Sequence, residues 1–204
     1  MTRVSAEDRR DALIEAAIRV IAAKGVTAAT TRAIVAEAGA SLASFHYAFR
    51  SRDEMMAELI TVVTTQEAES VVHALVPAET IEKTLEAGFH AYMNVVRSDP
   101  SREQAMFELN QYAMRTPGLE HLAREQYRTY FAVAEQILAA GAESGGLVWT
   151  RPLPELARLL ITITDGLTTT WLADRDDAAT DAVIRDAVDL IARYAVASPQ
   201  KENR

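Results

Sequence analysis

Residues 9–54 read RRDALIEAAIRVIAAKGVTAATTRAIVAEAGASLASFHYAFRSRDE, and this stretch predicts three short helices with a tight turn between the second and the third. The turn runs from Glu37 to Ser41. Gly39 permits the positive φ that ends one helix, and the Ser41 hydroxyl can cap the next helix. Two short helices joined in this way are typical of a helix-turn-helix, whose second helix enters the major groove of DNA. The stretch therefore predicts a DNA-binding domain.

The composition excludes several other classes of protein. The chain of 204 residues contains no cysteine, which rules out disulfides and thiolate metal sites. No run of about 18 apolar residues occurs, so we expect no membrane span. The first ten residues, MTRVSAEDRR, lack the apolar centre of a signal peptide. We therefore expect a cytoplasmic protein.

The charge is distributed unevenly along the chain. The formal net charge of the whole chain is -8, which is unexpected for a protein that binds nucleic acid. Residues 1–52, however, hold eight Lys and Arg residues against five Asp and Glu residues. A positive first segment on an acidic remainder is the asymmetry expected when one end of a protein meets phosphate. Chance clustering is the alternative explanation.

Helical periodicity continues to the end of the chain and predicts an all-α fold of about nine helices. An N-terminal DNA-binding domain, 1–53, is followed by a long helix and a helical ligand-binding and dimerisation domain, 54–204. The only strand-like piece, Gly146 to Trp149, we interpret as a loop. Apolar spacing, caps, Gly and Pro together predict helices at 8–24, 31–38, 42 to about 48, 53 to about 75, 79–97, 101–115, 119–143, about 155–173 and about 181–196.

The first 55 or so residues resemble the DNA-binding domain of the TetR family of bacterial transcriptional regulators. A short segment near the end, from Asp165 to Leu172, resembles the penultimate helix of that family. In the third predicted helix, 42 to about 48, His46 stands where the family usually has Tyr, and Tyr47 follows one position later. The residues that carry the N-terminal match are Ala16, Ala17, Lys24, Gly25, Thr30, Arg32, Ile34, Ala38, Gly39, Ser41, Phe49, Arg52 and Met56.

The resemblance implies a linked equilibrium between DNA and a small molecule. A dimer binds a partly palindromic operator and blocks transcription. A ligand in the C-terminal bundle favours a state that releases the DNA. The long helix that begins at Asp53 is the expected coupling element. A ligand-independent DNA-binding regulator on the same scaffold is an alternative.

We expect the candidate DNA contacts to lie on the second and third helices. Leu42 and Ala43 can pack on thymine methyl groups, while Tyr47 and Arg32 provide polar contacts to bases. Thr30, Ser44, His46 and Arg52 would hold phosphates. For each residue taken alone, a solvated surface side chain or a structural role is the alternative. Arg3, Arg9 and Arg10 in the N-terminal arm could reach the DNA backbone or the minor groove, with a disordered, solvated arm as the alternative. The full candidate set is Thr30, Arg32, Ser41, Leu42, Ala43, Ser44, His46, Tyr47 and Arg52.

The last two predicted helices carry more apolar surface than one core-facing stripe requires. Two such helices from each of two chains would form an isologous four-helix contact. We therefore predict a homodimer through helices at about 155–173 and about 181–196. Complete burial within one monomer is the alternative.

The middle helices are rich in methionine and aromatic residues, which adapt to varied apolar ligands. In the family that the chain resembles, helices 4 to 8 enclose an inducer site. We predict a small-molecule site there, with ordinary hydrophobic core as the alternative for each residue. Asp165 points to a cationic ligand, unless it only satisfies backbone or Arg groups. The candidate ligand-binding residues are Phe89, Tyr92, Met93, Met106, Asn110, Met114, Tyr127, Phe131 and Thr162.

Enzyme motifs are missing from the sequence. No Glu-x-x-His occurs, so the signature of carboxylate-bridged di-iron bundles is absent. There is no Gly-rich phosphate loop, nucleophile elbow or Cys/His cluster. We expect a protein that is not an enzyme and needs no cofactor and no metal. An all-helical small-molecule-binding protein or enzyme stays the unfavoured alternative.

Overall fold

The computed structural model describes the backbone of residues 6–74 and 79–198 and, within them, the side chains of residues 7–66 and 79–198. Two compact units divide the chain: unit 1 holds Met1–Gln66 and Asp99–Gln126, and unit 2 holds Glu67–Ser98 and Tyr127–Arg204. The units therefore alternate along the sequence. The predicted division at residues 53 and 54 concerns function, and it stays a prediction.

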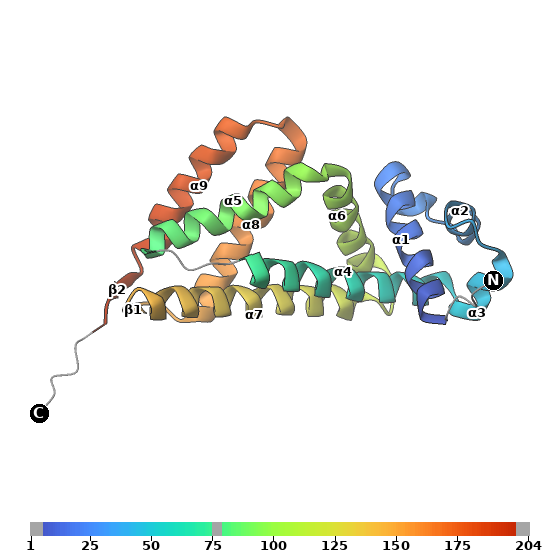
Figure 1. Ribbon diagram of the computed structural model, residues 1–204, viewed down its shortest axis with the longest axis horizontal. Coiled ribbons are helices and arrows are strands. Elements are labelled where there is room, and N and C mark those ends of the chain that lie inside the picture. The colour runs from blue at the N-terminus through green and yellow to red at the C-terminus, as the bar shows by residue number, and fades with distance from the viewer. Residues whose placement is uncertain (1–5, 75–78, 199–204) are drawn as a thin grey trace, which may run out of the picture. The chain divides into compact units, whose positions relative to one another are not determined.

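The described residues form nine α-helices, one short 3-10 helix and two short strands (Figure 1). The all-α prediction is confirmed, and most helix bounds agree with the predicted ones within two residues. In chain order the elements are α1 Ala6–Lys24, η1 Val26–Ala28, α2 Thr31–Glu37, α3 Leu42–Ala48, α4 Arg52–Ala74, α5 Ile81–Ser98, α6 Pro100–Arg115, α7 Glu120–Ser144, β1 Leu147–Trp149, α8 Leu153–Asp174, α9 Asp177–Ala192 and β2 Ala195–Ala197.

Two predictions about the end of the chain are wrong. The segment from Gly146 to Trp149 is not simply a loop, because its last three residues form β1, which pairs antiparallel with β2. The last helix begins earlier and ends earlier than 181–196. It begins after Asp176, whose carboxylate accepts a hydrogen bond from the Ala179 N–H at 2.9 Å. It ends at Ala192, because residues 195–197 pair with β1 instead.

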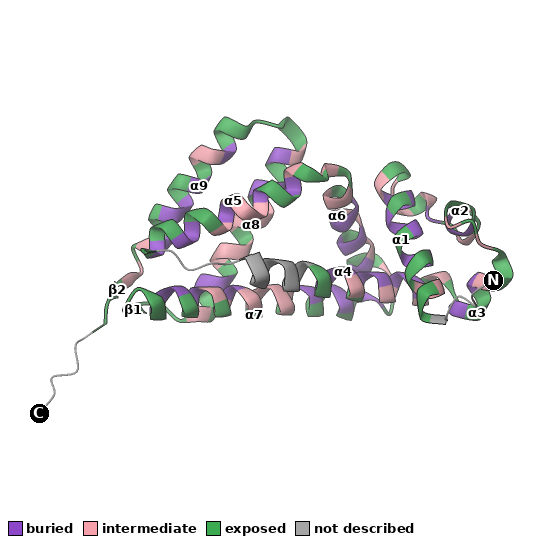
Figure 2. Ribbon diagram, viewed as in Figure 1, coloured by how far each residue is buried: buried purple, intermediate pink, exposed green. Residues whose placement is uncertain are grey.

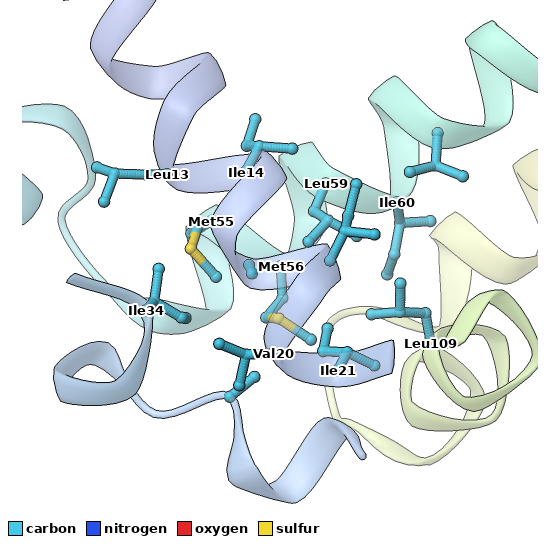
Figure 3. Close-up of a cluster of buried hydrophobic side chains, with 14 of the residues drawn as sticks. Leu13, Ile14, Val20, Ile21, Ile34, Met55, Met56, Leu59, Ile60 and Leu109 are labelled. Carbon is cyan, nitrogen blue, oxygen red and sulfur yellow. The ribbon is translucent and has the colours of Figure 1, made fainter. Parts of the chain in front are cut away.

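Unit 1 is built around one apolar core (Figure 3). Side chains of α1, α2, α4 and α6 meet there, α3 adds Phe45, and Phe49 follows directly after α3. Burying these side chains gives the short helices α2 and α3 the stability that seven residues alone lack. The labelled core residues in Figure 3 are Leu13, Ile14, Val20, Ile21, Ile34, Met55, Met56, Leu59, Ile60 and Leu109.

Unit 2 has a second core, to which α5, α8, α9 and the later part of α7 contribute. Figure 2 shows buried residues recurring along α5 and α9. Polar contacts join α5 to α9: the Arg97 guanidinium lies 2.7 Å from Asp177 Oδ1 and 3.2 Å from Asp181 Oδ1. The indole N–H of Trp149 in β1 donates to the Leu138 carbonyl of α7 at 2.8 Å.

No helix within the described part of the chain is both long and apolar enough to cross a membrane.

Candidate nucleic-acid interface and ligand-recognition cluster

The turn between α2 and α3 has the predicted geometry. Gly39 adopts a φ of 61°, in the left-handed region that favours glycine. The Ala40 N–H donates to the Val35 carbonyl at 2.8 Å, which closes the end of α2. Ser41 Oγ then accepts from the Ser44 N–H at 3.1 Å and caps α3. Residues 31–48 therefore form a helix-turn-helix.

The third helix has one buried face and one exposed face. Phe45 is fully buried and stacks obliquely on Phe49, with ring centroids 5.6 Å apart. Leu42 is 44% exposed and Tyr47 is 71% exposed. An exposed leucine and an exposed tyrosine on so short a helix offer apolar and hydrogen-bonding contact to a partner. Phe45 and Phe49 lie in the same core as Ile14 and Ile18.

Most of the candidate DNA-contacting residues lie on the surface of unit 1. Ser44 is half-buried, and its hydroxyl oxygen accepts from the Ser41 hydroxyl at 3.1 Å. Thr30 Oγ1 accepts from the Ala33 N–H at 3.2 Å and caps α2, which leaves its hydroxyl proton able to donate. The exposed members are Thr30, Arg32, Ser41, Leu42, Ala43, His46 and Tyr47.

Arg52 is placed differently from the rest of the set. Its side chain is only 26% exposed, and its guanidinium joins three parts of unit 1. Nε donates to the Ala29 carbonyl at 2.6 Å, and Nη2 donates to the Val26 carbonyl at 2.8 Å. Nη1 donates to Tyr112 Oη in α6 at 2.9 Å. The geometry supports a structural role for Arg52, and its contact with phosphate stays untested.

The two arginines at the start of α1 also differ in role. Arg10 pairs with Glu58, donates to the Ala48 carbonyl and lies 4.3 Å from the Phe49 ring centroid. Arg9 instead lies over the exposed Tyr47 ring, 5.5 Å from its centroid. The sequence alone did not distinguish the roles of Arg9 and Arg10. Arg3, the third arginine of the N-terminal arm, lies outside the described residues. Arg9 is therefore the arginine that shares the exposed face of α3.

The candidate ligand-binding residues are divided between the two units. Met106 and Asn110 are buried in unit 1, where Asn110 Nδ2 donates to Gln126 Oε1 at 2.8 Å. Met114 is also in unit 1 but is exposed. The structure therefore does not place these three residues in one unit with the remaining candidates, which are Phe89, Tyr92, Met93, Tyr127, Phe131 and Thr162.

Within unit 2 the candidates have different surroundings. Phe89 and Met93 are buried core residues of α5. Tyr92 Oη and Thr168 Oγ1 are 2.8 Å apart and form a hydrogen bond between α5 and α8. Thr162 is exposed, and its hydroxyl donates to the Arg158 carbonyl at 2.8 Å within its own helix. The role of Thr162 in binding a ligand stays a prediction.

A cluster of aromatic rings and one carboxylate joins α7 to α8. We call it the Tyr127–Asp165 cluster and define it as Tyr127, Tyr130 and Phe131 of α7 with Asp165 of α8. Tyr127 Oη donates to Asp165 Oδ2 at 2.8 Å. The Tyr127 ring centroid lies 6.0 Å from that of Tyr130 and 5.9 Å from that of Phe131. All four side chains are half-buried.

The environment of this cluster perturbs both of its central groups. Burial, followed by the hydrogen bond to Asp165, raises the pKa of Tyr127 to about 12. Burial also raises the pKa of Asp165, and the hydrogen bond from Tyr127 opposes that effect. Raised pKa values of this origin mark groups whose charged forms are poorly solvated. The described side chains contain no cluster of three or more His, Cys, Asp or Glu residues that could hold a metal ion.

Comparison with known families gives two matches. Residues 13–59 match the family described as "Bacterial regulatory proteins, tetR family". Residues 81–196 match the family described as "BetI-type transcriptional repressor, C-terminal". Together the two matches include the helix-turn-helix and the Tyr127–Asp165 cluster.

A curated relative and several solved structures are also similar. The chain is 33% identical over 175 residues to the HTH-type nicotine-responsive transcriptional repressor HdnoR of Paenarthrobacter nicotinovorans, which covers 86% of this chain and 89% of the relative. The regulator FadR of Bacillus subtilis, solved with stearoyl-CoA, has a TM-score of 0.69 at 18% identity, covering 89% of this chain and 97% of that chain. The multidrug-binding protein EbrR, solved with ethidium, has a TM-score of 0.69 at 24% identity, covering 90% and 98%. The solved structures share the fold.

Proposed function

The chain belongs to the TetR family of bacterial transcriptional regulators, with a BetI-type C-terminal segment, and we propose that it represses transcription as a ligand-released dimer. The exposed face of α3, which belongs to a capped helix-turn-helix, is the observation that supports DNA binding. Unit 2, which contains the Tyr127–Asp165 cluster, supplies the candidate ligand site. We place this activity in the cytoplasm, where the operator DNA would lie.

We propose that the exposed residues of α2 and α3, which we call the reading face, contact DNA through apolar and polar groups together. Leu42 and Ala43 would pack against thymine methyl groups, and Tyr47 would reach base edges or phosphate. Thr30, Ser44 and His46 would donate to phosphates and fix the register of α3, while Arg32 adds polar readout. Ser41 would contribute mainly through its cap of α3, because its hydroxyl already contacts Ser44.

Selection from a short random duplex library at two salt concentrations tests this function. Enrichment of a palindrome, with affinity falling steeply as salt rises, is the expected result, because phosphate contacts release counterions. Weak binding that enriches no sequence would contradict operator recognition. The enriched duplex then supplies the operator for the variants below.

Replacing Tyr47 by alanine is expected to lower operator affinity by about tenfold, the loss typical of one good base or phosphate contact. Because Tyr47 is 71% exposed, the thermal midpoint of unfolding should stay unchanged. Fluorescence anisotropy with the enriched duplex measures the affinity. Val95→Ala is the matched control, since Val95 is also an exposed apolar side chain but lies in unit 2. Equal affinities of Tyr47→Ala and the wild-type protein would remove Tyr47 from the reading face.

We propose that α8 and α9 form the dimer contact. Val183 and Leu190 of α9 are apolar, exposed and seven residues apart, which places them on one face of the helix. We expect this face to meet its copy in a second chain, as an isologous contact requires.

Replacing Val183 and Leu190 together by aspartate is expected to give a monomer, because the two carboxylates would be buried against their copies. Operator affinity should then fall by about tenfold or more, since the two helix-turn-helix segments of a dimer no longer bind as one unit. Analytical ultracentrifugation measures the mass, and Val95→Asp provides the same apolar-to-acidic change on an exposed residue of α5. A double variant that still sediments as a dimer would place the contact elsewhere.

A further inference from the structure

We propose that the ligand of unit 2 is an organic cation with an apolar body, held by the Asp165 carboxylate and the rings of Tyr127 and Phe131. This inference rests on the proposed function and names the chemical class of the ligand. It also predicts which class is rejected, because an anionic ligand would meet the same carboxylate.

The first observation is that Asp165 lies in an apolar helix without a cationic partner. Its neighbours along α8 include Ile161, Ile163 and Leu167, which pack in or against the core of unit 2. Among the side chains that the structure describes, no Lys, Arg or His forms an ion pair with Asp165. Its hydrogen-bond partner is the Tyr127 hydroxyl, which is neutral.

The second observation concerns the nearest basic residue on the same helix. Arg158 lies seven residues before Asp165, and its guanidinium carbon sits 4.4 Å from the Phe131 ring centroid. The chain thus places its own cation against a ring of the cluster instead of against the carboxylate. A cation of the chain itself thus stacks on this ring, as cation–π attraction allows.

This carboxylate lacks full compensation within the folded chain. Burial disfavours the ionised form of Asp165, and one hydrogen bond from a neutral phenol offsets only part of that cost. A half-buried acid that serves structure alone would be expected to have a cationic partner or several donors. A cation on the ligand provides the missing compensation. The free energy of binding therefore includes the recovered cost of burying the Asp165 carboxylate.

The third observation is the arrangement of rings beside the carboxylate. Tyr127 and Phe131 are four residues apart on α7 and therefore share one helix face, with Tyr130 next to them. Aromatic faces attract ammonium groups, and several rings around one cation are the usual means of recognising quaternary amines. A carboxylate next to such rings selects the charge, while the rings accommodate the apolar substituents.

The test compares cations with neutral molecules of similar shape, using the full-length protein without DNA. Nicotine is protonated at pH 7, whereas cotinine has the same two-ring skeleton with a neutral lactam. Benzyltrimethylammonium carries a permanent charge. By titration calorimetry we expect both cations to bind, with cotinine weaker than nicotine by about tenfold or more, which corresponds to one charge-assisted contact.

Variants then assign the selectivity to one residue. Asp165→Asn should lower the affinity for both cations by about tenfold or more and leave cotinine within about twofold. Tyr127→Phe should keep most of the affinity, because the ring face remains. The matched control is Glu143→Gln, which removes an equal charge from an exposed position near the end of α7. The thermal midpoint of Asp165→Asn should equal or exceed that of the wild-type protein, whereas a purely structural carboxylate would lower it.

Failure to bind either cation, or equal affinities for nicotine and cotinine, would overturn the inference with no variant needed. Unchanged cation affinity in Asp165→Asn would overturn it as well. These results are separable from failure of the proposed function. Release of the enriched operator by a neutral or anionic molecule alone would support the proposed repressor function and contradict the cationic ligand. Cation binding through Asp165 by a chain that enriches no DNA would support the cationic ligand and contradict the repressor function.

Discussion

Replacing Phe45 by alanine is expected to destabilise the protein by about 3–5 kcal/mol, the usual cost of removing a buried phenylalanine. Phe45 is 0% exposed and lies in the core of unit 1, with its ring edge-on to His46 and tilted against Phe49. The cavity left by the ring cannot close easily, because α3 has only seven residues and is fixed by its cap. Without that ring, α3 loses the contact that holds its exposed face in place.

Chemical denaturation followed by circular dichroism measures this loss, and operator binding measures its consequence. Leu42→Ala is the matched control on the same helix, because Leu42 is 44% exposed. We expect Leu42→Ala to change the free energy of unfolding by less than about 0.5 kcal/mol, as surface substitutions usually do. It should nevertheless weaken operator binding. Comparable stabilities of the two variants would contradict the division of α3 into a buried and an exposed face.

The helix-turn-helix could be predicted from sequence because its determinants are local. The cap at Thr30, the cap at Ser41 and the left-handed Gly39 each act within three or four residues. The apolar spacing of α1 is equally local. Such signals can be recognised without knowledge of any distant contact, and the structure confirms all of them.

The errors occur where distant residues determine the local structure. β1 and β2 have three residues each, too few for an alternating pattern, and each forms only because the other pairs with it. The end of α9 depends on the same pairing. The ligand candidates, which stay a prediction, were chosen by residue type, and residue type does not show that Met106 and Asn110 belong to a different compact unit from Phe89.

The Tyr127–Asp165 cluster shows the same limit at the candidate site. An aspartate within an apolar helix is a visible signal, and the sequence did single out Asp165. Its partner, however, lies 38 residues earlier on another helix, and no spacing rule joins the two. The outcome for Arg52 is similar, because its acceptors at Val26 and Ala29 and its partner Tyr112 are distant in sequence.

Replacing Arg52 by methionine is expected to destabilise the protein by about 2–4 kcal/mol, because two carbonyl groups of unit 1 lose their donor. Ala29 is fully buried, so water cannot readily replace the guanidinium at its carbonyl oxygen. Methionine keeps most of the apolar stem, and the loss therefore reports the hydrogen bonds. Tyr112 Oη also loses its contact with Nη1 but keeps its hydrogen bond to Asp53 Oδ1 at 3.0 Å.

Arg50→Met is the control, since Arg50 is exposed and changes the net charge equally. The midpoint of denaturation should fall for Arg52→Met and stay nearly constant for Arg50→Met. Operator binding, measured well below the midpoint over a range of salt concentrations, separates the structural role from a phosphate contact. If Arg52 contacts a phosphate, Arg52→Met should reduce the slope of log affinity against log salt concentration by about one. If the role of Arg52 is structural, the slope should stay unchanged while the stability falls. Full stability together with a reduced slope would show that Arg52 acts on DNA and that its internal hydrogen bonds contribute little to the fold.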